Sequence, residues 1–471
     1  MSEGGPLSSP TAVNKPVMTY TEFLDRSPVT GFLWTLIIGM ALASLLDGFD
    51  FQATAFALPG VVRAFHLGPA QAGGIQSVGN FGFAFGAIFI NVLCDRKGRR
   101  AMFQWVLLCY AFGAFVSAIA PNYHVLLVGR LISGLGIGAQ LPIVFSILAE
   151  FSPLKLRHLL VPMSPMCYAL GYVVVALCAV WLIPLYGWRA IYWAGIAPAF
   201  MAIYVRMYIP ESVRYLLSKG RIEEAGRITK DLAKRAGLDV ELIPPPETKK
   251  VKVGASEQFK VLRPLLGMTA AVSFFNLCYY VQSAGVFIWL PTIFVRQGFK
   301  LTTSFRYTLL VFCFTPLAQV LGAFMQGKMD RKWALFVMTV VGQIFFLTFG
   351  LSFQYHWPVW VLVGSQMAQT LFTQGTVAIL MTIASEMFPT SGRTLGVGVV
   401  TGVGRCGAIM GPLVLGFLFK FGTAISQIIY YFAVPLLVAC ILVVLTVKID
   451  LRKKSLEAIN QESQQAAGAR A

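Results

Sequence analysis

Long apolar segments constrain the fold of this chain more than any other feature. Twelve of them are long enough to cross a bilayer core of about 30 Å as helices, six before and six after a polar stretch. They lie at approximately 32–58, 72–93, 102–120, 125–149, 160–183, 188–208, 268–293, 307–327, 333–353, 357–385, 394–419 and 426–448. The pattern predicts an all-α polytopic membrane protein with twelve transmembrane helices in two six-helix bundles.

The polar segments divide the chain into five parts. Residues 1–30 lack the pattern of a signal peptide and are expected to form a disordered cytoplasmic tail. The bundles occupy 31–208 and 267–449. Between them, residues 209–266 alternate basic and acidic side chains, which indicates a water-exposed linker with an amphipathic helix. Residues 450–471 form a second tail.

Composition and charge support a membrane location and exclude other classes. Apolar residues make up 57% of the chain and charged residues only 12%, about half the usual share in soluble domains. The net charge of +18 comes from basic clusters between the apolar segments. This positive-inside pattern predicts cytoplasmic termini in the inner (plasma) membrane, and it makes a nucleic-acid partner unnecessary. We expect no cofactor, metal site or enzyme activity, because no metal-ligand cluster or nucleophile–base set stands out.

Two carboxylates, Asp47 and Asp50, lie deep in the first apolar segment. An ionised carboxylate at membrane depth costs at least about 2.5–3.5 kcal/mol, so such residues are transport or proton-relay candidates by default. Their spacing places them on one helix face, where two like charges cannot both ionise freely. We interpret them as proton-coupling residues; the alternative is a pair of acids at a misplaced helix end.

An internal repeat relates the two halves. The Asp-Arg-Lys sequence at 95–97 returns at 330–332, and the Glu-x-x-Pro sequence at 150–153 returns at 386–389, with offsets of 235 and 236 residues. Parallel repeats of this kind place a substrate site near the membrane midplane between the halves. Repeated charges are expected at the cytoplasmic helix ends, in structural or gating pairs. They are Asp95, Arg99, Glu150, Arg157, Asp330, Glu386 and Arg393.

Charges without a repeat mate need another explanation. Arg130 corresponds to Ser365 in the second half, and Arg405 to Ala169. Arg405 is expected near the midplane among glycines, where it could anchor an anion. Tyr279 and Gln282, which map onto the site of the two acids, are candidate partners for a ring substituent. Arg130, Arg405, Tyr279 and Gln282 are therefore substrate-binding candidates, each with a structural role as the alternative.

Five motifs carry a family resemblance: Asp-Gly-Phe-Asp at 47–50, Asp-Arg-Lys-Gly-Arg-Arg at 95–100, Gly-Arg-Leu-Ile-Ser-Gly-Leu-Gly at 129–136, Pro-Glu-Ser-Val-Arg-Tyr-Leu at 210–216 and Gly-x-Gly-Arg-x-Gly-x-x-x-Gly-Pro at 402–412. Over nearly the whole chain it resembles the major facilitator superfamily, most of all the aromatic acid/proton symporter family. The resemblance implies import of benzoate or a hydroxybenzoate with protons, by rocking of the two bundles. The chain departs from the family pattern at Asn91, four residues before Asp95, where the motif of the loop after the second apolar segment usually begins with glycine.

Two alternatives to this function stay open. The same fold could carry another organic anion, such as nicotinate, a sugar acid or sialic acid. A ligand sensor on the same scaffold would instead bind saturably without net flux. In each case we expect a monomer whose partners are a small organic anion, protons and the lipid bilayer.

Overall fold

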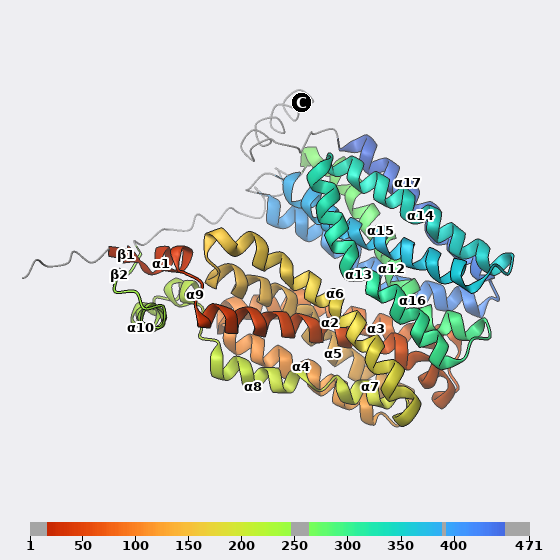
Figure 1. Ribbon diagram of the computed structural model, residues 1–471, viewed down its shortest axis with the longest axis horizontal. Helices are drawn as coiled ribbons and strands as arrows, with labels where there is room; N and C mark the ends of the chain where they lie inside the picture. Colours follow the sequence, from red (N-terminus) through yellow and green to blue (C-terminus); the bar gives the residue numbers. More distant parts are fainter. Residues whose placement is uncertain (1–16, 246–262, 389–391, 448–471) are drawn as a thin grey trace, which may run out of the picture.

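The computed structural model describes residues 17–245, 263–388 and 392–447 (Figure 1). Within these ranges twelve helical segments are long and apolar enough to cross a membrane, which confirms the predicted number and the division into two halves. The N-terminal spans are α2 (Gly31–Phe65), α3 (Pro69–Lys97), α4 (Arg99–Ile119), α5 (Tyr123–Phe151), α6 (Leu154–Tyr186) and the pair α7 (Arg189–Ala194) and α8 (Pro198–Tyr208).

The C-terminal half follows a short 3₁₀ turn, η1 (Arg263–Leu265). Its spans are α12 (Leu266–Arg296), α13 (Leu301–Lys328), α14 (Arg331–Gln354), α15 (Val359–Glu386), α16 (Arg393–Lys420) and α17 (Ile425–Thr446). Most helices extend past the apolar segments that predict them, because their last turns carry polar residues at the membrane surface.

The halves converge at one end of the molecule and diverge at the other (Figure 1). We call the end that carries the linker helices the linker end, and the opposite one, where α2 and α12 finish, the far end. At the far end the ring of Phe56 on α2 packs against Phe305 and Phe312 on α13, with ring centroids 5.5 and 5.8 Å apart. One hydrophobic core spans both halves there, whereas toward the linker end each half has its own. The molecule is therefore closed at the far end and open at the linker end.

Glycines allow the close crossing of α3 and α16 at the far end. A Cβ on Gly73 would collide with the backbone carbonyl oxygen of Pro412, and one on Gly416 would lie 2.6 Å from that of Pro69. Small residues of this kind let helix backbones approach each other in a membrane. The crossing joins the two halves directly.

The start of the chain corrects one expectation. Residues 1–30 are predicted to be disordered, yet from Val17 onward they form β1 (Val17–Thr19) and α1 (Tyr20–Arg26). Strand β1 pairs in parallel with β2 (Glu241–Ile243) of the linker, a partner that is distant in sequence and therefore hard to foresee. Residues 1–16 and 450–471 lie outside the described ranges.

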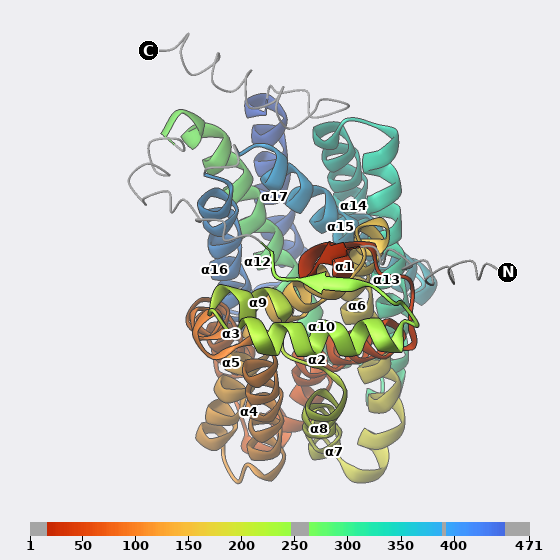
Figure 2. The same ribbon diagram turned by 90° about the vertical axis from the view of Figure 1, so that its left-hand side faces the viewer.

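The linker contains two helices, α9 (Val213–Ser218) and α10 (Ile222–Arg235), and α10 is the expected amphipathic helix. It lies across the ends of the N-terminal spans (Figure 2). Together with β1, α1 and β2 these helices form a small layer that we call the linker domain. The layer packs on the N-terminal half, through the hydrophobic core that includes Phe23, Tyr215 and Leu232.

Candidate functional site

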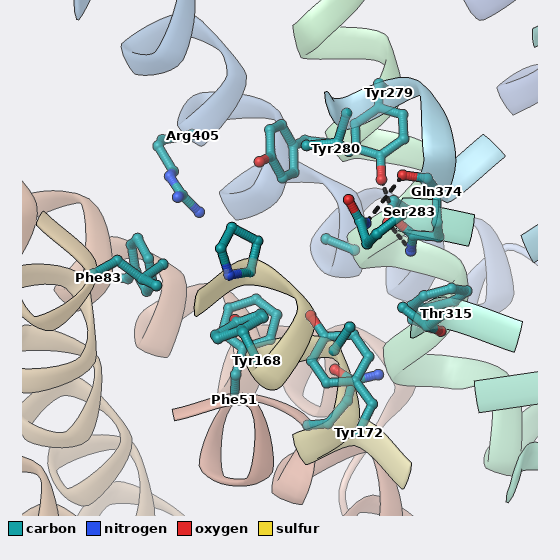
Figure 3. Close-up of a pocket in the computed structure, with 18 of the residues that line it drawn as sticks. Phe51, Phe83, Tyr168, Tyr172, Tyr279, Tyr280, Ser283, Thr315, Gln374 and Arg405 are labelled. Atoms are coloured by element: carbon teal, nitrogen blue, oxygen red, sulfur yellow. Dashed lines mark hydrogen bonds between the residues drawn. The ribbon is translucent and has the colours of Figure 1, made fainter. Parts of the chain in front are cut away.

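A cavity of about 180 Å³ lies between the two halves (Figure 3). Aromatic side chains from both halves dominate its wall: Phe51, Phe83, Phe145, Tyr168, Tyr172, Tyr279, Tyr280 and Phe287. An apolar cavity of about 150 Å³ is known to hold a benzene ring in another protein. The size and lining therefore suit a ligand with one aromatic ring.

Close helix crossings position these rings. A Cβ on Gly48 of α2 would collide with the carbonyl oxygen of Tyr168 on α6, so only glycine permits this contact. The crossing brings Phe51 next to two tyrosines, with its ring centroid 6.0 Å from that of Tyr168 and 6.4 Å from that of Tyr172. A ligand ring in the cavity would meet this aromatic group from the N-terminal half.

Arg405 is the only charged residue among the described residues that line the cavity. Its guanidinium carbon lies 4.0 Å from the ring centroid of Phe83 and 5.5 Å from that of Tyr280, so it contacts rings of both halves. No ion pair joins Arg405 to another residue in the described part of the chain. The half-buried cation is available to an anionic ligand.

The glycine-rich sequence around Arg405 explains its position. A Cβ on Gly404 would collide with the Asn276 side chain of α12, and one on Gly407 with the Leu277 carbonyl oxygen. Helix α16 therefore packs directly on α12. Its arginine lies beside Tyr280, one turn further along α12.

A polar group occupies the side of the cavity away from Arg405 (Figure 3). The Tyr279 hydroxyl donates to Oε1 of Gln374, whose Nε2 donates to the Ser283 hydroxyl over 3.2 Å. The Thr315 hydroxyl also lines the cavity and has no hydrogen-bond partner among the described residues. Sequence reasoning singled out Tyr279 but missed the others; a glutamine inside an apolar span was the available signal for Gln374.

The two acids of α2 lie beside the cavity rather than in its wall, which α2 lines with Phe51 and Gln52. Oδ1 of Asp50 lies 3.2 Å from Nη1 of Arg130, and Nη2 of Arg130 donates to the Asp50 backbone oxygen over 3.2 Å. Asp47 is fully buried, and neither of its carboxyl oxygens has a hydrogen-bond partner in the described chain. The structure thus brings Asp50 and Arg130 together one helical turn from Asp47.

Two of the four substrate-binding candidates do not reach the cavity. Arg130 is almost completely buried in its pair with Asp50, and its guanidinium carbon lies 5.5 Å from the ring centroid of Tyr192. Gln282 forms a pair of amide hydrogen bonds with Gln343, each 3.2 Å long. Arg405 and Tyr279 are the candidates that line the cavity.

The repeated glutamates, Glu150 and Glu386, each form an ion pair within their own half, with arginines that are not repeat mates of each other. Nε of Arg99 lies 3.3 Å from Oε1 of Glu150, and Nη2 of Arg331 lies 3.2 Å from Oε1 of Glu386. Arg331 was not among the candidates. Each ion pair joins neighbouring helices of a single half.

The remaining repeated charges have different surroundings in the two halves. Arg157 contacts the linker domain, with Nη2 2.7 Å from Oδ1 of Asp25. Its repeat mate Arg393 donates from Nε to the Phe388 carbonyl oxygen over 3.4 Å. Asp330 directly precedes α14, without a side-chain cap. Asp95 belongs to α3, but its side chain lies outside the described part of the structure.

Comparisons with known proteins agree with this arrangement. The model of the sugar (and other) transporter family matches residues 36–462. The niacin transporter NiaP of Acinetobacter baylyi is 29% identical, over 93% of this chain and 98% of its own length. The 4-hydroxybenzoate transporter PcaK of Pseudomonas aeruginosa is 27% identical, with the same two shares. An inward-open structure of the xylose transporter XylE from E. coli superposes with a TM-score of 0.72 at 15% identity, covering 91% of this chain and 99% of XylE.

Proposed function

Because the chain belongs to the sugar (and other) transporter family of the major facilitator superfamily, we propose that it imports a small aromatic carboxylate together with protons by alternating access. The twelve spans of the described residues and their fold are those of that superfamily. The protein is a multi-pass membrane transporter and not an enzyme. The cargo, the coupling and the direction are what we propose here.

The observation that carries the proposal is the unpaired Arg405 in a cavity lined by aromatic rings. A guanidinium can hold a carboxylate with two parallel hydrogen bonds, and the ligand's ring would pack among the tyrosines and phenylalanines. Since Arg405 belongs to the C-terminal half and Phe83 to the other, a ligand held here contacts both halves. Relative movement of the two halves would therefore change the contacts of the bound ligand.

The names of the relatives narrow the substrate class. Niacin and 4-hydroxybenzoate, which the two relatives named above transport, are both single-ring aromatic acids. Either would present a carboxylate to Arg405 and a ring nitrogen or hydroxyl to the group around Gln374. Sugar acids and sialic acid lack the flat ring that this lining favours. Benzoate, hydroxybenzoates and nicotinate are therefore the substrates to test first.

We assign proton coupling to Asp47 and Asp50. A buried carboxylate without a partner is costly when ionised, so Asp47 is suited to carry a proton. Asp50 has the Arg130 guanidinium as its partner, and protonation of Asp50 would remove the charge that holds this pair together. Proton binding at α2, adjacent to Phe51 in the cavity wall, would in this way alter the packing of α2, α5 and the ligand.

The direction of opening follows from the charge pattern. If basic loops face the cytoplasm, the linker end is cytoplasmic and the described state is open to the inside. The pairs Arg99–Glu150 and Arg331–Glu386 then lie at the inner gate, each confined to one half. Accessibility tags at Ser2, Ala471 and near Pro245 should react only from the cytoplasmic side; external labelling of any of them would reverse the orientation.

Uptake into proteoliposomes tests the proposal. Labelled nicotinate, 4-hydroxybenzoate and benzoate should each be offered with and without an inward proton gradient, with nicotinamide and xylose as uncharged controls. We expect at least one acid to accumulate when the gradient is present and not when it is absent. Neither control should accumulate under either condition. Saturable binding of the acid without uptake would favour the sensor alternative, and gradient-driven uptake of xylose alone would refute the aromatic-acid assignment.

A further inference from the structure

A second cavity, of about 350 Å³, lies where the linker domain meets the membrane-spanning helices. Its wall is formed by Phe32 of α2, the start of α4, the end of α8 and one face of α10, which lies across the ends of the N-terminal spans (Figure 2). The charged residues that line it are three arginines, Arg100, Arg227 and Arg235, and one carboxylate, Asp231. The cavity is distinct from the one that contains Arg405.

Two of the three arginines have no carboxylate partner for their guanidinium group among the described residues; the nearby Glu211 carboxylate accepts instead from the backbone N–H of Arg100, over 3.2 Å. The single acid pairs with the neighbouring arginine of its own helix, with Nη2 of Arg235 2.8 Å from Oδ2 of Asp231. Arg100 donates from Nη2 to the Arg206 backbone oxygen, while its Nε is buried with no hydrogen-bond partner among the described residues. Neither Arg100 nor Arg227 forms an ion pair with a described side chain. An anion with several acceptor oxygens would satisfy both guanidinium groups.

The cavity lies at the depth of the lipid headgroups. Trp34, near the start of α2, and Tyr208, at the end of α8, are exposed, as aromatic residues at a membrane surface commonly are. Further into the span, the exposed apolar side chains of Phe200 and Ile203 on α8 form a surface for acyl chains. Met207 and Tyr208 belong both to this surface and to the cavity wall. A path therefore leads from the lipid-facing side of α8 to the arginines.

We propose that this cavity binds the phosphate of an anionic glycerophospholipid, with the acyl chains along α8. Two guanidinium groups that pair with no described carboxylate favour a lipid of net negative charge, such as phosphatidylglycerol, over zwitterionic phosphatidylcholine. The bound headgroup links α10 of the linker domain to α4 and α8 of the N-terminal half. This lipid site is independent of the substrate that the transporter carries.

Native mass spectrometry of the full chain in detergent tests the site, with phosphatidylglycerol or phosphatidylcholine added. We expect the parent protein to retain one phosphatidylglycerol preferentially. The double variant Arg100→Gln/Arg227→Gln should bind it roughly tenfold or more weakly, since each basic group near the surface contributes to anionic-lipid affinity. The matched control is Lys230→Gln/Lys234→Gln, which removes the same charge from exposed positions of α10 outside the cavity.

Three outcomes would overturn the proposal. The first is equal retention of phosphatidylglycerol and phosphatidylcholine by the parent protein. The second is an equal loss of phosphatidylglycerol binding in the two double variants. The third is displacement of bound phosphatidylglycerol by millimolar inorganic phosphate, which would indicate a site for a soluble anion. The melting temperature in lipid-free detergent checks that each variant is folded. Should the double variant fail this check, Arg227→Gln alone decides, because this side chain is exposed and makes no hydrogen bond in the described chain.

Discussion

Replacing Arg405 by alanine should weaken the binding of an aromatic acid much more than the binding of its amide. Arg405 is the only charged residue among the described residues lining the cavity, and no carboxylate of the described chain pairs with it. An acid would therefore lose its one charged partner. Nicotinate and nicotinamide share a pyridine ring and differ only in their substituent, a carboxylate in one and an uncharged amide in the other. They therefore form a matched pair of ligands.

The magnitude follows from the surroundings of the guanidinium. Truncating one partner of a desolvated charge pair costs about 2–5 kcal/mol, and Arg405 is only half-buried, so the lower part of this range applies. A loss of about 2–3 kcal/mol corresponds to roughly 30- to 150-fold in Kd. Arg405→Lys keeps the charge but loses the planar fork and part of the contact with the Phe83 ring, and about 1 kcal/mol, near fivefold, is expected.

Isothermal titration calorimetry on purified protein measures both ligands against the parent, Arg405→Ala and Arg405→Lys. Arg63→Ala, which removes an exposed charge from the last turn of α2, controls for the change in net charge. We expect a large loss for nicotinate and a change below about threefold for nicotinamide, which gains no charge pairing from Arg405. Parallel losses of acid and amide would refute the reasoning, because they would show that Arg405 shapes the cavity and that the carboxylate is bound elsewhere.

Three further predictions concern coupling, stability and closure. Asp50→Asn should abolish gradient-driven accumulation while leaving substrate counterflow, and equal loss of both would indicate a binding or folding defect. Gln282→Ala should lower the free energy of unfolding by about 1–3 kcal/mol, because it leaves the Gln343 amide without its partner, and the substrate Kd should not change. A change in Kd without a change in stability would instead indicate that Gln282 binds the substrate. Gly73→Ala should increase hydrogen exchange at the far ends of α3 and α16, whereas Gly364→Ala, with open space around its Cβ, should not; similar exchange in both would contradict the tight crossing.

The sequence alone determined the number of spans, their grouping and the charges of interest. These follow from local patterns, since the bilayer requires about twenty apolar residues per helix and makes each buried charge conspicuous. Arg405 and the acid pair of α2 were predicted in this way, whereas Tyr279 was predicted from its place in the internal repeat. Gln282 shows what a local pattern leaves open: its polarity in an apolar span is evident from the sequence, but its pairing with Gln343 of another helix is not.

Only the tertiary structure decided which of these groups meet. Each helical residue turns its side chain by about 100°, so small differences in helix rotation determine whether a residue faces a cavity or a neighbouring helix. Arg130 consequently faces Asp50 and not the cavity that contains Arg405. Gln374 lines that cavity although the sequence did not single it out. The tertiary structure was also needed to determine which end of the molecule is open. Two arrangements of the same halves differ in free energy by only a few kcal/mol and have the same sequence, so no sequence pattern distinguishes them.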